Sequence, residues 1–303
     1  MTLPSTRTLS FEGELDFAHT LGPLGVGRSD PTRAIGRDGA AWATRTPVGP
    51  ATLLVQRKEE AALHLEAWGD GAEWVLEHAP DLLGLGDEPP SPDDFPEPIR
   101  RLAKRRPGIR FARGHQVVEL LVPAVLQQKV SNKEAKRAFR NLVARLSEPA
   151  PGPFDELRLP LGPEQLRDLT PALLPPLGIL PRQGETLRRI GERASRLEEA
   201  GQMTEADAFA RLTALPGLGP WTASSVMGRG LGFADQVPLG DWSLPHLVAF
   251  RLAGEERADD ARMIELLEPF RGHRGRVIRW LHTTGKNRPR RGPRMALRPL
   301  PRA

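Results

Sequence analysis

The segment LPGLGPWTA, residues 215–223, constrains the fold more than any other stretch of this chain. Gly217 and Gly219 stand between two segments with helical spacing, and each would cost a helix interior about 1 kcal/mol relative to alanine. Pro220 is a residue type favoured at the first position of a helix. The segment therefore predicts two helices joined by a tight turn, a hairpin over residues 212–226, with Leu218 directed back between them.

The backbone of such a hairpin suits an anion. Glycine lets the chain approach a ligand closely, and the first turn of the second helix leaves N–H groups without partners. A phosphate group is therefore a candidate ligand of the turn at Gly217 and Gly219. When a G-x-G is considered alone, a helix–helix turn without a ligand is its commoner explanation. The longer sequence pattern around it is needed to distinguish such a turn from a phosphate-binding one.

The composition limits the class of protein. The chain of 303 residues has 39% hydrophobic and 27% charged residues, which is typical of a globular protein with buried cores. It contains no cysteine, which excludes disulfides, cysteine-held zinc and cysteine-ligated iron–sulfur clusters. No apolar run reaches the length of a membrane span, and the N-terminus lacks the apolar core of a signal peptide. We therefore expect a cytoplasmic protein with no membrane partner.

The pattern of apolar residues changes along the chain. Residues 1–90 hold short alternating runs broken by glycine and proline, which predict an N-terminal α+β domain of antiparallel strands with a helix near Ala72–His78. The acidic, proline-rich SPDDFPEP, which begins at Ser91, is typical of a linker. Residues 91–285 then show helical spacing, with Asn132 expected to cap one of the helices. The expected fold class is mainly α.

The formal net charge of +5 is concentrated at the C-terminus. Residues 286–303 carry seven lysines or arginines and no acidic residue, whereas the rest of the chain is slightly acidic. This composition predicts a basic, flexible tail. Attraction to phosphate backbones and simple solubilisation both remain open as its role.

A longer motif surrounds the hairpin: apolar–x–x–apolar–Pro–Gly–apolar–Gly–x–x–Thr–Ala, followed by FADQVPLGDWSLP. It resembles the helix-hairpin-helix DNA glycosylase superfamily, and within it the 3-methyladenine DNA glycosylase II (AlkA) group. The segments DLLGLG, LQQKVS, LGILPRQGETL and LLEPFRGHRGRVIRWL extend the likeness, in the same order, over residues 81–282. The resemblance implies an all-helical core of two subdomains around a cleft, preceded by a small α+β domain.

Asp241, 22 residues after Gly219, stands where the resemblance implies the catalytic carboxylate. Breaking an N-glycosidic bond builds positive charge on the sugar, and a carboxylate close to it stabilises that charge. An aspartate that merely caps the helix WSLPHLVAFRL is the alternative interpretation. The hairpin motif upstream favours the catalytic role.

Trp221 occupies the position at which family members that also cut the DNA strand carry a lysine. That lysine forms a Schiff base with the sugar, and an indole has no amine with which to do so. The resemblance therefore implies a monofunctional enzyme without AP-lyase activity.

The predicted base pocket consists of Trp221, Trp242, Ser225 and His282. A base in a duplex must be extruded to reach Asp241, and a cationic alkylated base stacks well on indole. The resemblance implies pocket aromatics near the positions that Ser225 and His282 occupy. Trp280, in contrast, is expected in the core.

The predicted DNA contacts are Gly217, Leu218, Gly219, Trp221 and Thr222 of the hairpin, with Gln128 and Lys129 from LQQKVS. The resemblance puts at Lys129 the wedge that fills the gap left by a flipped base, although such wedges are usually apolar. It also implies a monovalent cation on the hairpin carbonyls of Thr213, Leu215 and Leu218. The histidines and carboxylates show no metal-ligand spacing, and no iron–sulfur cluster is expected.

These observations predict a monofunctional DNA glycosylase of base excision repair, a DNA-3-methyladenine glycosylase II-like N-glycosyl hydrolase. It would release alkylated bases of the 3-methyladenine and 7-methylguanine type from damaged double-stranded DNA. We expect it to be a monomer associated with the nucleoid. A non-enzymatic helix-hairpin-helix protein that binds damaged DNA is the alternative, and a helical scaffold without a DNA role is a third.

Overall fold

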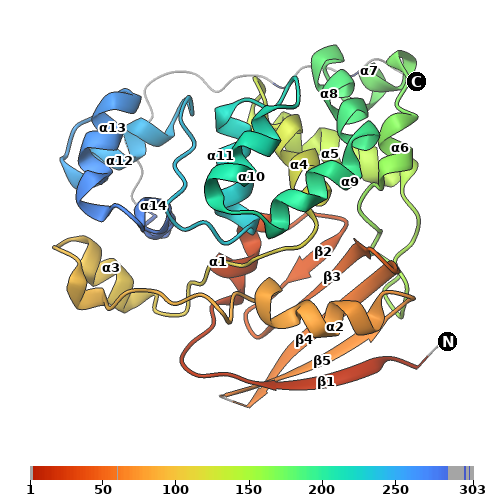
Figure 1. The fold of residues 1–303 in the computed structure, drawn as a ribbon, viewed down its shortest axis with the longest axis horizontal. Coiled ribbons are helices and arrows are strands. Elements are labelled where there is room, and N and C mark those ends of the chain that lie inside the picture. The colour runs from red at the N-terminus through yellow and green to blue at the C-terminus, as the bar shows by residue number, and fades with distance from the viewer. Residues whose placement is uncertain (1–2, 60, 286–296, 298–299, 301–303) are drawn as a thin grey trace.

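Five antiparallel strands form a sheet at the start of the chain in the computed structural model, which describes residues 3–59, 61–285, 297 and 300 (Figure 1). Their order across the sheet is β1-β5-β4-β3-β2. The strands are β1 (Ser5–Ser10), β2 (Arg33–Ile35), β3 (Gly39–Thr46), β4 (Gly49–Glu59) and β5 (Ala62–Trp68). Leu63, Leu65 and Ala67 alternate with more exposed residues along β5, so one face of this strand is buried.

Each face of the sheet is covered. Helix α2 (Ala72–Leu82) packs on β1, β4 and β5 through Val75, Leu76 and Ala79, while the short α1 (Phe17–Leu21) lies beside β2. Ala41 and Ala43 of β3 face the other way and pack against Leu157 and other residues of the later segment 150–159. The predicted strands and helix of the first 90 residues are thus present, with the helix four residues longer than expected.

The central helical region comprises α4 (Val117–Leu126), α5 (Asn132–Leu146), α6 (Pro163–Arg167), α7 (Leu174–Leu177), α8 (Pro181–Glu192), α9 (Ala194–Glu198), α10 (Glu205–Thr213) and α11 (Pro220–Gly230). Helix α4 lies at its centre and is buried at every apolar position. Its apolar cluster includes residues of the sheet and of α2 as well, so the core is continuous across residue 90. The domain boundary at that residue stays a prediction.

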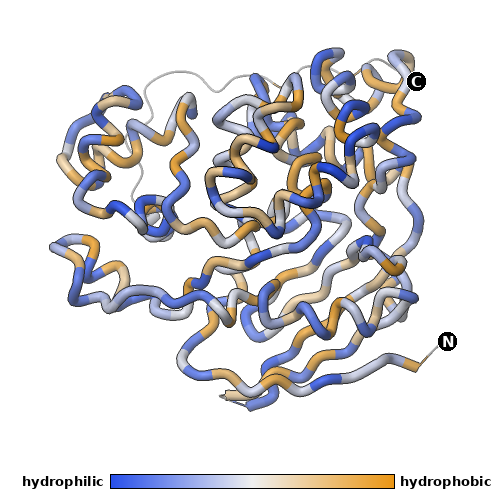
Figure 2. The backbone as a smooth tube through the Cα atoms, viewed as in Figure 1, coloured by the Kyte–Doolittle hydropathy of each residue, from blue (hydrophilic) through white to orange (hydrophobic). Residues whose placement is uncertain are grey.

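A second helical region gathers α3 (Ile99–Arg105), α12 (Leu244–Leu252), α13 (Asp260–Leu267) and α14 (Arg274–His282) around its own apolar cluster. It lies beside α10 and α11 in Figure 1, and the change of hydropathy every few residues along the tube is visible in Figure 2. Two helical cores and a small sheet therefore confirm the expected fold class. Five 3₁₀ turns complete the described elements: Gly22–Leu24, Pro92–Asp94, Pro171–Leu173, Glu199–Gln202 and Glu268–Phe270.

Two local expectations were wrong. The stretch SPDDFPEP is no free linker, because Ser91 caps a 3₁₀ turn and Phe95, 5% exposed, packs edge-on against Trp280. The cap of α5 is Ser131 and not Asn132, since the Ser131 hydroxyl accepts the Glu134 amide (3.3 Å) and the Glu134 carboxylate accepts the Ser131 amide (3.0 Å).

The predicted basic tail, residues 286–303, lies outside the described residues except for Leu297 and Leu300. Within the described part of the chain, every helix is too short or too polar to cross a lipid bilayer.

Candidate active site beside the helical hairpin

The hairpin predicted from the glycines is present. Helix α10 ends at Thr213 and α11 begins at Pro220, and the Leu218 side chain between them is 2% exposed. The Leu218 amide donates to the Leu215 carbonyl at 3.0 Å, which closes the turn. Gly219 directly precedes α11, so the first amides of that helix lie next to an exposed glycine without intrahelical acceptors.

Gln128 fastens the hairpin to the rest of the protein. Its Nε2 donates to the Gly217 carbonyl (3.0 Å) and to the hydroxyl of Thr222 (2.9 Å), which is itself 2% exposed. Gln183 of α8 donates in turn to the Gln128 carbonyl at 3.0 Å. Gln128 and Thr222 thus position the turn from within, and their direct contact with DNA stays a prediction. Lys129 follows with an exposed side chain and a φ of 56°, the one left-handed residue other than glycine in the described chain.

The two hairpin glycines have different structural roles, which a pair of variants can separate. Gly217 has a φ of +102°, and a Cβ there would overlap the Thr186 side chain, whereas Gly219 has a φ of −83° and open space around it. We expect Gly217→Ala to lower the melting temperature by several degrees, corresponding to roughly 1–3 kcal/mol of backbone and steric strain. Gly219→Ala is the matched control and should melt like the wild type. Equal melting temperatures for all three proteins would contradict this assignment.

The Asp241 carboxylate joins the hairpin to α12. Its Oδ2 accepts the indole N–H of Trp221 at 3.0 Å. Its Oδ1 accepts the amides of Ser243 (2.8 Å) and Leu244 (2.9 Å) and the Ser243 hydroxyl (3.1 Å) at the start of α12. One oxygen therefore accepts amides at the start of α12, whose N-cap residue is Ser243, while the other accepts the indole of the first turn of the hairpin helix.

Hydrogen bonds keep Asp241 ionised. Partial burial acts to raise the pKa of Asp241, but the bonds from Ser243, Trp221 and Leu244 outweigh it, so the pKa lies below its ordinary value. The side chain is partly exposed and is a carboxylate at neutral pH. It can therefore stabilise positive charge on a bound group without first losing a proton.

Arg229 and His282 complete the surroundings of Asp241. Burial lowers the pKa of Arg229, and the charge of Asp241 acts in the opposite direction. Burial lowers the pKa of His282. The charge of Asp241 opposes this, and the charges of three arginines, the first of them Arg229, add to the lowering, so the imidazole is neutral at neutral pH although it keeps solvent access. We call Trp221, Arg229, Asp241 and His282 the Asp241 cluster.

Arg279 of α14 holds the last turns of α11 in place next to this cluster. Its Nη2 donates to the Gly228 carbonyl (2.7 Å), its Nη1 donates to the Arg110 carbonyl (3.0 Å), and its guanidinium lies 3.7 Å from the centre of the Phe111 ring. Burial, followed by the charge of Arg276, lowers the pKa of Arg279 to about 9. Neither Arg229 nor Arg279 was predicted from the sequence. A signal was available for Arg229, because a basic residue eight positions after Trp221 lies on the same side of the hairpin helix.

Trp242 and Trp280 differ strongly in exposure. The Trp242 side chain is 90% exposed, and its place in the base pocket stays a prediction. Trp280 is 3% exposed in the second helical core, as expected. Ser225 is 3% exposed, and its hydroxyl has no hydrogen-bond partner among the described residues.

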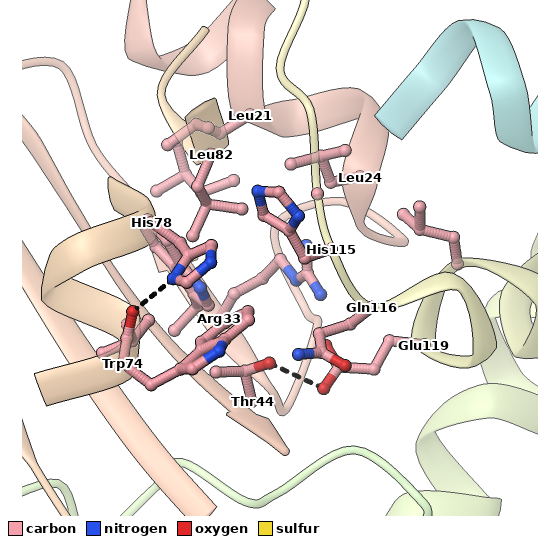
Figure 3. Close-up of a pocket in the computed structure, with 15 residues that line it drawn as sticks. Leu21, Leu24, Arg33, Thr44, Trp74, His78, Leu82, His115, Gln116 and Glu119 are labelled. Atoms are coloured by element: carbon pink, nitrogen blue, oxygen red, sulfur yellow. Dashed lines mark hydrogen bonds between the residues drawn. The ribbon is translucent and has the colours of Figure 1, made fainter. Parts of the chain in front are cut away.

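A separate small cavity of about 40 Å³ lies where the sheet meets the helices, lined from α1, β2, β3, α2 and α4 (Figure 3). The Glu119 carboxylate at its edge accepts the Thr44 hydroxyl and the Arg45 amide, both at 2.7 Å. His78 stacks on Trp74 with 3.8 Å between ring centres. The volume holds a few water molecules. None of the predicted site residues lines this cavity.

Two half-buried glutamates, one in α4 and one that bonds its first turn, make the stability depend on pH. Burial raises the pKa of Glu119 to about 6 and that of Glu198, which accepts the first amides of α4, to about 7. Between the ordinary value of 4.5 and about 7 the folded protein therefore binds more protons than the unfolded chain, so these groups reduce stability as the pH rises. We expect Glu119→Gln, which keeps the accepting oxygen, to gain in melting temperature relative to wild type from pH 5 to 8. The exposed Glu164→Gln should show no such trend, and parallel curves for all three proteins would contradict it.

No group of three or more histidine or acidic side chains is arranged for a metal ion in the described part of the chain. Of the three hairpin carbonyls predicted to hold a monovalent cation, that of Leu215 already accepts the Leu218 amide.

Comparison with known proteins supports the fold. No protein-family model matches the chain. A stretch of 152 residues, 48% of this chain, is 32% identical to the "probable bifunctional transcriptional activator/DNA repair enzyme AlkA" of Mycobacterium tuberculosis, and it spans only 29% of that protein. A 3-methyladenine DNA glycosylase from Archaeoglobus fulgidus superposes with a TM-score of 0.76 at 19% identity, covering 91% of this chain and 97% of the other.

Two further solved structures are similar. MBOgg1 in complex with a low-affinity DNA ligand has a TM-score of 0.71 at 14% identity, covering 93% of this chain and 97% of the other. The 3-methyladenine DNA glycosylase of Schizosaccharomyces pombe in complex with abasic DNA has a TM-score of 0.51 at 20% identity, covering 63% and 94%. The first two likenesses extend over nearly the whole chain.

Proposed function

We propose that this chain, which has the fold of the helix-hairpin-helix DNA glycosylases and resembles their AlkA-like members, is a monofunctional DNA glycosylase that removes alkylated bases from duplex DNA. The observation that carries the proposal is the hydrogen bond between Asp241 and Trp221, because it places an ionised carboxylate beside the first turn of the hairpin helix. The alkylated-base class follows the two 3-methyladenine glycosylases to which the chain is similar.

The proposed reaction is hydrolysis of the bond between C1′ of the deoxyribose and the base. As this bond breaks, its electron pair leaves with the base, and positive charge develops on the sugar. Asp241 stabilises that charge, and a water molecule then bonds to C1′ through its oxygen. The water gives up one proton, which passes to solvent when a cationic base leaves neutral and to the base when it leaves as an anion. The indole N–H of Trp221 and the amides at the start of α12 fix the direction of the carboxylate.

The hairpin is the proposed anchor on the DNA backbone. Gly217 and Gly219 are exposed, and the free amides at the start of α11 suit a phosphate group. Leu218 is buried between α10 and α11 and supports this turn from the protein side. A monovalent cation on the carbonyls of Thr213, Leu215 and Leu218, a monomeric state and action at the nucleoid belong to the same proposal.

The absence of a lysine at position 221 sharpens the proposal, and the DNA product tests it. A duplex with one alkylated base, after incubation with the protein, should stay intact until hot alkali cleaves it at the abasic site. Borohydride should trap no covalent complex, because Trp221 cannot form a Schiff base. Strand cleavage without alkali, or a trapped complex, would refute a monofunctional mechanism. Binding to damaged DNA without any abasic site would favour the non-enzymatic alternative.

A further inference from the structure

Gln183 is a buried glutamine at the start of α8 whose amide bonds two separate parts of the chain. It is 2% exposed and lies in the first turn of the helix. Its Oε1 accepts the Leu180 amide at 2.9 Å, which completes the start of α8. Its Nε2 donates to the carbonyls of Leu126, the last residue of α4, and of Gln128 in the loop that follows, at 3.2 and 3.0 Å. Gln183 therefore joins α8 to the loop between α4 and α5.

That loop holds Lys129 in a strained conformation. The φ of Lys129, 56°, lies in the left-handed region, and among the described residues other than glycine it is the one such case. Conformations of this kind persist only where the surrounding structure fixes them. The Gln128 carbonyl that Gln183 binds belongs to the peptide group that leads directly into Lys129. The buried amide of Gln183 thus fixes the peptide plane next to the strained residue.

The same side of α8 contacts the hairpin. Thr186, three residues after Gln183 and 3% exposed, lies so close to Gly217 that a Cβ on that glycine would overlap its side chain. The Gln128 side chain completes the connection, because its Nε2 donates to the Gly217 carbonyl at 3.0 Å and to the Thr222 hydroxyl at 2.9 Å. Hydrogen bonds through Gln183 and Gln128 therefore fix the hairpin turn and the loop between α4 and α5 relative to each other.

The charge of Lys129 determines the kind of contact that it suits. Its side chain is exposed and has no ion-pair partner in the described part of the chain. An ammonium in the gap of a base stack would lose its water without meeting an opposite charge, whereas an ammonium on a backbone phosphate forms a charge-assisted hydrogen bond. The neighbouring hairpin turn also suits a phosphate. Lys129 therefore fits a phosphate of the DNA backbone better than the wedge position that the resemblance implies.

We propose that Gln183 is a positioning residue for DNA binding. Through Gln128 it holds the hairpin turn and Lys129 in one arrangement, in which the turn and the Lys129 ammonium bind two phosphates of a lesion-containing duplex. This inference rests on the proposed function, because it names the residue that builds the DNA-binding part of the same site. Gln183 is buried and touches no DNA itself, so its effect reaches the duplex through Gln128 and Lys129.

The test is a double-variant cycle on the affinity for a duplex with one alkylated base, measured over a range of salt concentrations. Lys129→Met should weaken binding about fivefold and reduce the steepness of log affinity against log salt by about 1, the value for one lost phosphate contact. Gln183→Met keeps the length of the side chain but removes both donors. It should reduce the steepness by the same amount and weaken binding about tenfold, because it also loosens the hairpin turn. In the Gln183→Met background, Lys129→Met should weaken binding less than about twofold further.

Gln165→Met is the matched control. Gln165 occupies the same position in α6, where its Oε1 accepts the Gly162 amide at 2.8 Å and its Nε2 donates to the exposed Glu148 side chain at 2.8 Å. This variant loses the same kind of helix start as Gln183→Met and should change neither the affinity nor its salt dependence. If Gln183→Met does not fold, Gln183→Glu takes its place in the cycle, because it keeps the oxygen that accepts the Leu180 amide and lacks both donors.

The salt dependence separates positioning from a general loss of stability, because a lower melting temperature does not change the number of phosphates that the folded protein contacts. Additive losses of affinity, or a Gln183→Met protein with the salt dependence of the wild type, would overturn the inference alone if the protein still releases bases. Failure of the wild type to bind duplex DNA would overturn the proposed function and the inference with it.

Discussion

Asp241→Asn is expected to lower the rate of base release by about 10²- to 10³-fold while leaving the affinity for lesion-containing DNA nearly unchanged. Asparagine keeps an oxygen that can accept the Ser243 and Leu244 amides, so α12 should still begin in the same place. It lacks the negative charge that stabilises the developing sugar cation. The measurement is single-turnover release of the free base at saturating protein, with DNA affinity determined separately.

Asp259→Asn is the control for this variant, since Asp259 caps α13 by accepting the Arg262 amide at 2.9 Å and has no part in the Asp241 cluster. Both variants remove the charge of an aspartate at the start of a helix, so any loss of stability from capping should be similar. Only Asp241→Asn should lose activity. If both variants kept full activity, Asp241 would be a helix cap and nothing more.

Asp87→Ala is expected to cause the largest loss of stability, about 3–5 kcal/mol, because it strands a buried charge. Arg276 of α14 is 1% exposed, and its two terminal nitrogens bond the Asp87 carboxylate at 2.6 and 2.9 Å. The same carboxylate accepts the Phe111 amide at 2.9 Å, and the guanidinium lies 4.7 Å from the centre of the Phe111 ring. Denaturant unfolding followed by tryptophan fluorescence measures the loss.

Two comparisons make the Asp87 prediction specific. Asp93→Ala removes an exposed carboxylate that pairs with Lys104, and its melting temperature should stay close to that of the wild type. Adding Arg276→Leu to Asp87→Ala removes the stranded charge and should recover part of the lost stability. The prediction would be contradicted if Asp87→Ala were as stable as the wild type, or if the double variant were less stable than Asp87→Ala. Either result would show that the ion pair between Asp87 and Arg276 is not what joins α14 to residues 81–87.

The hairpin could be predicted from the sequence because its signals are local. The positive φ of Gly217, the favoured first position of Pro220 and the burial of Leu218 all follow from residue type and spacing over nine residues. Asp241 was predicted from the family resemblance that this motif carries, at its place 22 residues after Gly219. Its double hydrogen bonding was not, because the two partners, Trp221 and Leu244, belong to helices that meet only in the folded chain.

The environments of Trp242 and Arg229 could not be predicted from the sequence. Trp242 was predicted in the base pocket from its place next to Asp241; the turn that directs the Asp241 carboxylate toward the hairpin leaves the Trp242 side chain 90% exposed, and its pocket role stays a prediction. Nothing in the sequence distinguishes Arg229 from the other arginines. In the folded chain the charge of Asp241 acts on it, and α14 contacts the end of α11 beside it. Such relations depend on how elements pack, and a single sequence does not encode them in any local pattern.

Mass spectrometry of the free bases released from a set of lesion-containing duplexes tests the central claim most directly. The set should include ethenoadenine, 7-methylguanine, 3-methyladenine, hypoxanthine and uracil, each in the same sequence. A DNA glycosylase for alkylated bases should release at least one alkylated base intact, in an amount equal to the abasic sites formed in the DNA. Binding to these duplexes without release of any base would contradict the account.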